Sequence, residues 1–91
     1  MTNMNVIEFD NEIYDTIRRN IKKYRKEKRL TAAELAETVG LSHDFIRQIE
    51  SEKAAYKFSV ETFYKISVAL EIGLDKFVVK SDMQTAQSDK W

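Results

Sequence analysis

The sequence predicts an all-α fold of five short helices in one compact domain, and two observations carry this prediction. The 91 residues include no proline and only two glycines, whereas a β-rich chain with many tight turns needs more of both. Apolar residues recur three and four positions apart in successive segments, which is the spacing of an amphipathic helix. Hydrophobic residues make up 43% of the chain, which is enough for one small core but not for two.

The sequence lacks the marks of several protein classes. It has no cysteine, so it forms no disulfide and no thiolate metal site. No apolar run approaches the roughly 18 residues of a membrane span and no signal peptide opens the chain, so we expect a cytoplasmic protein without a membrane partner. His43 is the single histidine and no clustered carboxylates accompany it. We therefore expect no enzyme activity, metal, cofactor or small-molecule ligand.

The first long helix is expected from about Glu12 to Lys28, after an N-terminal arm of residues 1–11 that has no helical period. Its buried stripe recurs at spacings of four, four and three residues and comprises Ile13, Ile17, Ile21 and Tyr24. Arg25 falls beside this stripe. A partly buried guanidinium needs an anionic partner, so we expect one for Arg25.

The second helix is expected from Ala32 to Val39 and has clear signals at both ends. Thr31 stands before it and Glu34 follows three residues later, which is the pattern of a capping box. Gly40 ends it, because the left-handed conformation of such a stop costs glycine little.

The third helix, Ser42 to Ser51, begins with Ser42 as its N-cap and forms a helix-turn-helix with the second. Two helices that cross steeply after a short turn need a small residue at their closest approach, which Ala36 supplies. They also need branched apolar residues to fill the angle between them, and Ile46 and Ile49 meet that need.

Two further helices complete the domain, which we expect to span residues 12–79 and to precede a polar tail, residues 80–91. Ser59 caps the fourth helix, about Val60 to Leu70, whose apolar residues predict that it is largely buried: Phe63, Ile66, Val68, Ala69 and Leu70. The fifth helix runs from Leu74 to Val78. Its apolar residues either form a dimer surface or complete the core: Leu74, Phe77 and Val78.

The net charge is zero, but the charges are unevenly distributed. Residues 18–29 hold eight basic residues and one acidic residue, a net charge of +7. Residues 30–52 hold five acidic residues and one basic residue, a net charge of −4. The basic block either supports a nucleic-acid interface or is simply a solvated helix face. The acidic segment favours a protein partner instead of DNA.

With five helices laid out, the chain resembles the Cro and phage-repressor (XRE) type of helix-turn-helix domain over about residues 17–78. The resemblance rests on three segments: IRRNIKKYRKEKRLTAAELAETVGLS, DFIRQIE and FSVETFYKISVALEIGLDKF. It implies a lambda-repressor-like fold, binding of double-stranded operator DNA as a homodimer, and a role in transcription regulation. It also implies that Ser42–Ser51 is the recognition helix and that Arg25 and Glu50 form a buried ion pair.

In the major groove each base pair presents a distinct pattern of hydrogen-bond donors and acceptors. The candidates for reading it are the outward residues of the recognition helix, His43, Asp44, Arg47 and Gln48. Arg47 is suited to a bidentate pair with guanine, and Gln48 to adenine or a phosphate. His43 can donate to a base edge. Asp44 either accepts from cytosine or only complements the helix dipole.

Contacts to phosphates fix the position of a protein on DNA and its affinity, but they do not give sequence specificity. The candidate residues for such contacts are Thr31, Ala32, Ser42, Ser51, Lys53, Tyr56 and Lys57. Ala32 stands where the family usually has glutamine, so only its backbone N–H can reach phosphate. Glu52 stands where glycine is common, and Arg29 replaces a common helix-ending glycine.

The predicted function is a sequence-specific DNA-binding regulator, a repressor of phage or mobile-element type that binds a palindromic operator as a dimer. The alternative is a protein-interaction module, antitoxin-like or a co-regulator, with weak or no DNA binding. The salt dependence of binding separates the two functions. A protein that neutralises Z phosphates releases counterions, so the logarithm of its binding constant falls with the logarithm of the salt concentration with a slope of about −0.9Z. Binding to a protein partner need not show this slope.

Overall fold

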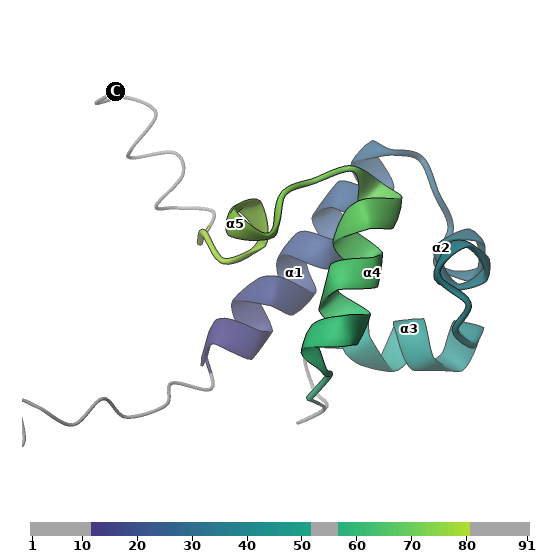
Figure 1. Cartoon of the computed structure of the whole chain (residues 1–91), viewed down its shortest axis with the longest axis horizontal. Helices are drawn as coiled ribbons and strands as arrows, with labels where there is room; N and C mark the ends of the chain where they lie inside the picture. The colour runs from purple at the N-terminus through teal and green to yellow at the C-terminus, as the bar shows by residue number, and fades with distance from the viewer. Residues whose placement is uncertain (1–11, 52–56, 81–91) are drawn as a thin grey trace, which may run out of the picture.

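The computed structural model describes residues 12–51 and 57–80, and every regular element in them is a helix. The five helices are α1 (Glu12–Glu27), α2 (Ala32–Val39), α3 (His43–Glu50), α4 (Val60–Leu70) and α5 (Leu74–Phe77) (Figure 1). The predicted all-α class with five helices is confirmed. The expected arm, residues 1–11, and residues 81–91 of the expected tail lie outside the described residues.

The helices are arranged around α1 and α4, which contact each other. Figure 1 shows α2 and α3 on one side of this pair and α5 on the other. The α2–α3 corner has the predicted geometry, since Leu35, Ile46 and Ile49 are fully buried and Ala36 lies between the helices with almost no exposed surface. The same core includes Ile21, Ile66 and Phe77.

The predicted capping box of α2 is present. The Thr31 hydroxyl accepts a hydrogen bond from the Glu34 N–H at 3.0 Å, and the Glu34 carboxylate accepts one from the Thr31 N–H at 2.8 Å. Gly40 ends the helix at φ 75°, as predicted, and no atom lies close to where its Cβ would be. Gly40 is therefore required by its backbone conformation and not by crowding.

Two other helix ends adopt a left-handed residue that is not glycine. Arg29 after α1 has φ 61° and Glu71 after α4 has φ 59°. At the first, the Leu30 N–H returns to the Arg25 carbonyl at 3.1 Å, so the chain closes the helix as a glycine would. At the second, the Ile72 N–H returns to the Ser67 carbonyl at 3.0 Å in the same way, although both side chains carry a steric cost that glycine would avoid.

The expected burial of α4 is partly wrong. Ile66 and Leu70 are fully buried, but Val68 is 56% exposed, and Val60 and Tyr64 are exposed with it. These three residues are four apart and share the outer face of the helix. For α5 the sequence left two alternatives, a dimer surface or completion of the core. Phe77 lies in the core, whereas Leu74 and Val78 are exposed.

The basic block on α1 is not a uniformly solvated face. Arg18 is buried and donates to Asp15 at 2.9 Å. Asn20 is also buried, and its Nδ2 donates to the Phe77 carbonyl at 2.6 Å and to the Val79 carbonyl at 2.9 Å. The amide of Asn20 thus holds the end of α5 against the middle of α1.

Candidate nucleic-acid interface

Helix α3 has one face fixed by the core and one face free. Ile46 and Ile49 are fully buried, whereas the predicted base-reading residues are all exposed: His43, Asp44, Arg47 and Gln48. None of these four side chains forms a hydrogen bond or ion pair with another residue in the described part of the chain. Their polar groups are therefore available to a ligand.

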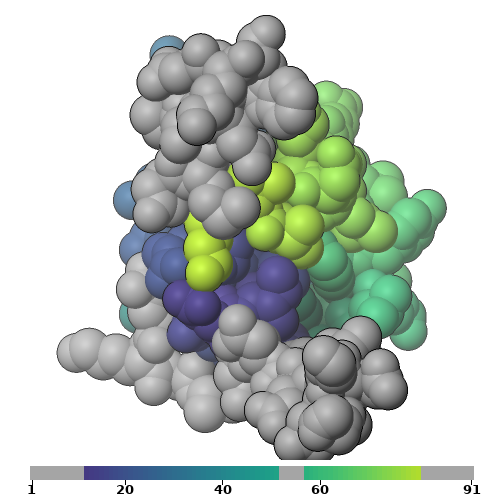
Figure 2. Space-filling view, turned by 90° about the vertical axis from the view of Figure 1, so that its left-hand side faces the viewer, coloured from purple at the N-terminus to yellow at the C-terminus, as the bar shows by residue number. Residues whose placement is uncertain are grey.

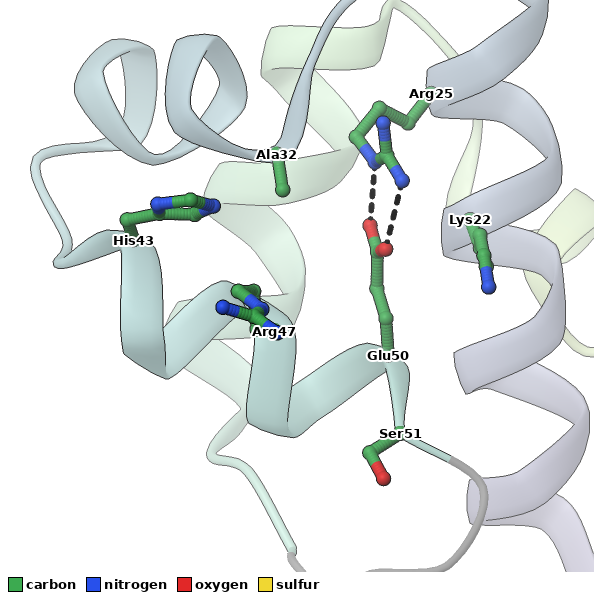
Figure 3. Close-up of a pocket in the computed structure, with 7 residues that line it drawn as sticks. All are labelled: Lys22, Arg25, Ala32, His43, Arg47, Glu50 and Ser51. Carbon is green, nitrogen blue, oxygen red and sulfur yellow. Dashed lines mark hydrogen bonds and ion pairs between the residues drawn. The ribbon is translucent and has the colours of Figure 1, made fainter.

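The buried end of α3 is held to α1 by the expected pair of Arg25 and Glu50. Arg25 Nε donates to Glu50 Oε2 at 2.6 Å and its second terminal nitrogen donates to Oε1 at 2.9 Å, which is a bidentate pair (Figure 3). The remaining guanidinium nitrogen donates to the Leu30 carbonyl at 2.7 Å. The hydrogen bonds that Arg25 donates to the Glu50 carboxylate raise the pKa of Arg25 above its ordinary value.

Ser42 and Thr31 serve first as helix caps. The Ser42 hydroxyl accepts from the Phe45 N–H at 3.0 Å, as the Thr31 hydroxyl does for Glu34. A hydroxyl that accepts in this way keeps its own O–H for another acceptor. Both residues are exposed, so capping α2 and α3 is compatible with donation to a phosphate.

A hollow of about 280 Å³ lies between α1, the start of α2 and α3. Figure 3 shows it, with Ala32 and His43 at the α2–α3 side and Lys22 on α1. Its lining residues are Lys22, Arg25, Ala32, His43, Arg47, Glu50 and Ser51. A second hollow, also about 280 Å³, is lined by Asp44, Arg47, Gln48 and Ser51. Arg47 and Ser51 border both.

The two hollows bring together most of the residues that the sequence predicted as DNA contacts, and they add one that it did not predict. This residue is Lys22, which the sequence marks only as a member of the basic block. It lies three residues before Arg25 on α1 and so shares that residue's face of the helix. Because Arg25 is expected to contact Glu50 on the third helix, this three-residue spacing is the sequence signal that places Lys22 beside that helix.

The other predicted phosphate contacts are more dispersed. Ala32 and Ala33 begin α2, and their N–H groups have no acceptor in the described part of the chain. Lys57 is exposed, with its Nζ 5.9 Å from the centre of the Tyr14 ring. Lys53 and Tyr56 lie outside the described residues.

The acidic segment, residues 30–52, is not an open acidic surface in the residues that the structure describes. The charge of Glu50 is compensated by Arg25, and Glu34 accepts from its own cap residue. Glu34, Glu37 and Asp44 are the exposed acidic side chains in residues 30–51, and Arg47 is an exposed basic side chain among them. This arrangement weakens the argument for a protein partner that binds the segment through its charge.

Neither a membrane-crossing helix nor a metal-binding group is found in the described ranges, 12–51 and 57–80. No helix there combines the length and apolar character needed to cross a bilayer. No three His, Asp or Glu side chains in the same ranges are close enough together to hold a metal ion.

Comparisons with known proteins agree with this geometry. The sequence profile of the helix-turn-helix family HTH_3 matches residues 21–77. No curated protein matches the chain. Among solved structures, SinR, described as the master regulator for biofilm formation and solved in complex with DNA, is 30% identical. The match covers 69% of this chain and 98% of SinR, with a TM-score of 0.63.

Two further structures share the fold at lower identity. The hypothetical transcription factor NHTF from Neisseria is 15% identical, with a TM-score of 0.77 over 91% of this chain and 92% of that one. The clp gene regulator ClgR from Corynebacterium glutamicum is 21% identical, with a TM-score of 0.69 over 85% and 84% of the two chains.

Proposed function

This chain belongs to the Cro/C1-type helix-turn-helix family of DNA-binding transcription regulators, and we propose that it is a sequence-specific repressor of phage or mobile-element type that binds a palindromic operator as a homodimer. The observation that carries the proposal is the free outer face of α3 beside two open hollows. SinR, the 30% identical relative, is itself solved in complex with DNA, which supports DNA as the ligand.

In this proposal α3 enters the major groove and its outer residues read base edges. Arg47 makes a bidentate pair with guanine, which is worth roughly 1–3 kcal/mol of discrimination. Gln48 pairs with adenine or reaches a phosphate, and His43 donates to a base acceptor. Asp44 accepts from cytosine only if it lies deep in the groove, since it repels phosphate; its other role is to complement the N-terminus of α3.

The backbone contacts in this proposal come from helix starts and from the connection after α3. The free N–H groups of Ala32 and Ala33 face a phosphate, with the Thr31 and Ser42 hydroxyls as further donors. Ser51 and Lys57 contribute from beyond α3, together with Lys53 and Tyr56 of the segment that lies outside the described residues.

The proposed dimer places two α3 helices in successive major grooves, roughly 34 Å apart. Its candidate surface is the exposed apolar pair Leu74 and Val78, because Phe77 is committed to the core. Twofold symmetry of the protein then requires twofold symmetry of the operator.

The protein-interaction alternative has one observation in its favour. An apolar groove of about 320 Å³ lies between α2 and α4 and includes Val39, Tyr64 and Val68. It is separate from the α3 face, so a partner there would not depend on Arg47.

The test is selection from a random duplex library, with the bound sites sequenced, for the wild type, Arg47→Ala and the control Lys65→Ala. Lys65 is exposed on α4 and lies outside both hollows. We expect a twofold symmetric site for the wild type and the control, and loss of definition at one base position per half-site for Arg47→Ala. No enriched sequence at low salt, from a chain shown to be folded, would reject the proposal and favour the protein-interaction alternative.

A further inference from the structure

The outer face of α4 carries an apolar stripe that the other described residues leave open. It consists of Val60, Tyr64 and Val68, which are 78%, 57% and 56% exposed. The three residues are four positions apart, so they form one continuous row along the helix. A contiguous row of this kind marks a contact surface, whereas single exposed apolar residues do not.

The stripe borders the apolar groove of about 320 Å³ between α2 and α4. Tyr64 and Val68 line the groove on the α4 side together with Ala69, and Val39 lines it on the α2 side. The surface of α4 therefore offers both a projecting row and a hollow beside it. A partner helix that presents a similar row can place its side chains in such a hollow, as ridges pack into grooves between helices.

The order of residues along the stripe is symmetric about Tyr64. A valine lies four positions before it and another lies four positions after it. A twofold axis at Tyr64 that relates two antiparallel copies of α4 therefore places Val60 of one copy against Val68 of the other, on both sides of the two tyrosines. Such self-complementarity is what a twofold interface requires.

The charges beside the stripe follow the same symmetry. Glu61 and Lys65 form an ion pair at 3.1 Å and lie on the edge of the stripe that is nearer to α2. When two helices pack antiparallel, equivalent edges meet, so Glu61 of each copy lies beside Lys65 of the other. Parallel helices would instead bring this edge to the edge that holds Ser67, which is buried and uncharged. Charge complementarity therefore favours the antiparallel arrangement.

We propose that the outer face of α4 is a self-association surface that binds α4 of a second copy of this chain in antiparallel orientation. The inference goes beyond the proposed function and does not depend on DNA. Figure 1 shows α3 at the end of the molecule where α4 begins, so the two α3 helices of an antiparallel pair lie at opposite ends. This contact therefore differs from the operator dimer proposed above, which places both α3 helices on one duplex.

Charge reversal in the full chain tests the inference by sedimentation velocity at low salt. Glu61→Lys leaves two cations on the edge of the stripe, and Lys65→Glu leaves two carboxylates. Each change makes both symmetry-related contacts repulsive, so each variant alone should self-associate about tenfold more weakly than the wild type. An equimolar mixture of the two variants should associate as strongly as the wild type, because opposite edges then meet.

The control pair separates local contacts from net charge. Glu27→Lys and Lys26→Glu change the net charge by the same amounts, but both residues are exposed on α1. We expect each control variant to associate as the wild type does and their mixture to show no gain. Leu74 and Val78 are unchanged in every sample, so any contact through α5 contributes equally to all of them.

Tyr64→Ser tests the apolar part of the surface. The residue is exposed, so the thermal midpoint should stay close to that of the wild type, while self-association should weaken at least tenfold. A wild type that stays monomeric at all concentrations would overturn the inference and leave the face to a different protein. Single charge reversals that associate as the wild type does, or a mixture that does not recover, would overturn the antiparallel pairing.

Discussion

Two ion pairs link the C-terminal end of α1 to other parts of the fold at the same distance but in different surroundings. Arg25 Nε lies 2.6 Å from Glu50, and Lys28 Nζ lies 2.6 Å from Glu71. The side chains of the first pair are 11% and 7% exposed, and those of the second are 35% and 76% exposed. The two pairs therefore differ in their contribution to stability, although their distances are the same.

The buried pair fixes geometry at a considerable cost of desolvation. Removing two charges from water is expensive, and their attraction repays this only when the remaining hydrogen-bonding groups are also satisfied. Arg25 meets that condition, because its third contact is the Leu30 carbonyl. The pair therefore matters less for net stability than for setting the position of α3, since loss of one partner strands the other.

The exposed pair has the opposite character. Water solvates both charges before and after folding, and salt screens their attraction. The hydrogen bond from Lys28 lowers the pKa of Glu71 below its ordinary value of 4.5, and the charge of Lys28 acts in the same direction. Its contribution to stability is small and depends on pH.

The largest expected effect comes from breaking the buried pair. Glu50→Gln should lower the free energy of unfolding by about 3–5 kcal/mol, because it leaves Arg25 charged and without its counter-ion. Glu37→Gln is the control, an exposed carboxylate on α2, and should change stability by less than about 0.5 kcal/mol. Urea denaturation followed by circular dichroism measures both. Equal midpoints would mean that burial of the pair has no energetic consequence.

Replacing both partners should have an intermediate effect. Arg25→Met combined with Glu50→Met removes both charges and keeps an apolar side chain at each position, which is often neutral for a buried pair. The Leu30 carbonyl then loses its donor, so we expect a remaining deficit of about 1–3 kcal/mol. The same urea titration applies. A double variant less stable than Glu50→Gln would contradict the explanation by a stranded charge.

The smallest expected effect concerns the exposed pair. A carboxyl whose pKa is lowered by folding stabilises the folded state above its unfolded pKa and loses this contribution as pH falls through its folded pKa. The difference in thermal midpoint between the wild type and Glu71→Gln should thus be constant above pH 4.5 and vanish in more acidic solution. It should also shrink in high salt. A difference that grows towards acid pH would show that another group causes it.

The predictions from sequence succeeded where the signal lay within a few residues. Thr31 and Glu34 are three positions apart, and Gly40 directly follows the helix that it ends, so local chemistry determines both ends of α2. The apolar stripes predicted which face of α1 and α3 is buried. The position of Arg25 beside its stripe indicated the need for an anion, and the family resemblance suggested Glu50.

The predictions were incomplete where the partner is distant along the chain. Asn20 is buried because of carbonyls at positions 77 and 79, and no periodicity within α1 can indicate this. The apolar character of Val68 predicts burial, but its position on α4, in line with Val60 and Tyr64, places it on the outer face of the helix. Lys22 belongs to the candidate site only because α3 packs beside its turn of α1, which is a tertiary relation.

The two ends of the described domain are held together. Lys80 Nζ lies 3.0 Å from a carboxylate oxygen of Glu12, and Figure 2 shows the start of α1 beside the residues that follow α5. The end of α5 is also held to α1 by Asn20. A second domain fused before residue 12 or after residue 80 would therefore emerge from the same patch of surface. A circularly permuted form of residues 12–80 would therefore need only a short linker from residue 80 to residue 12.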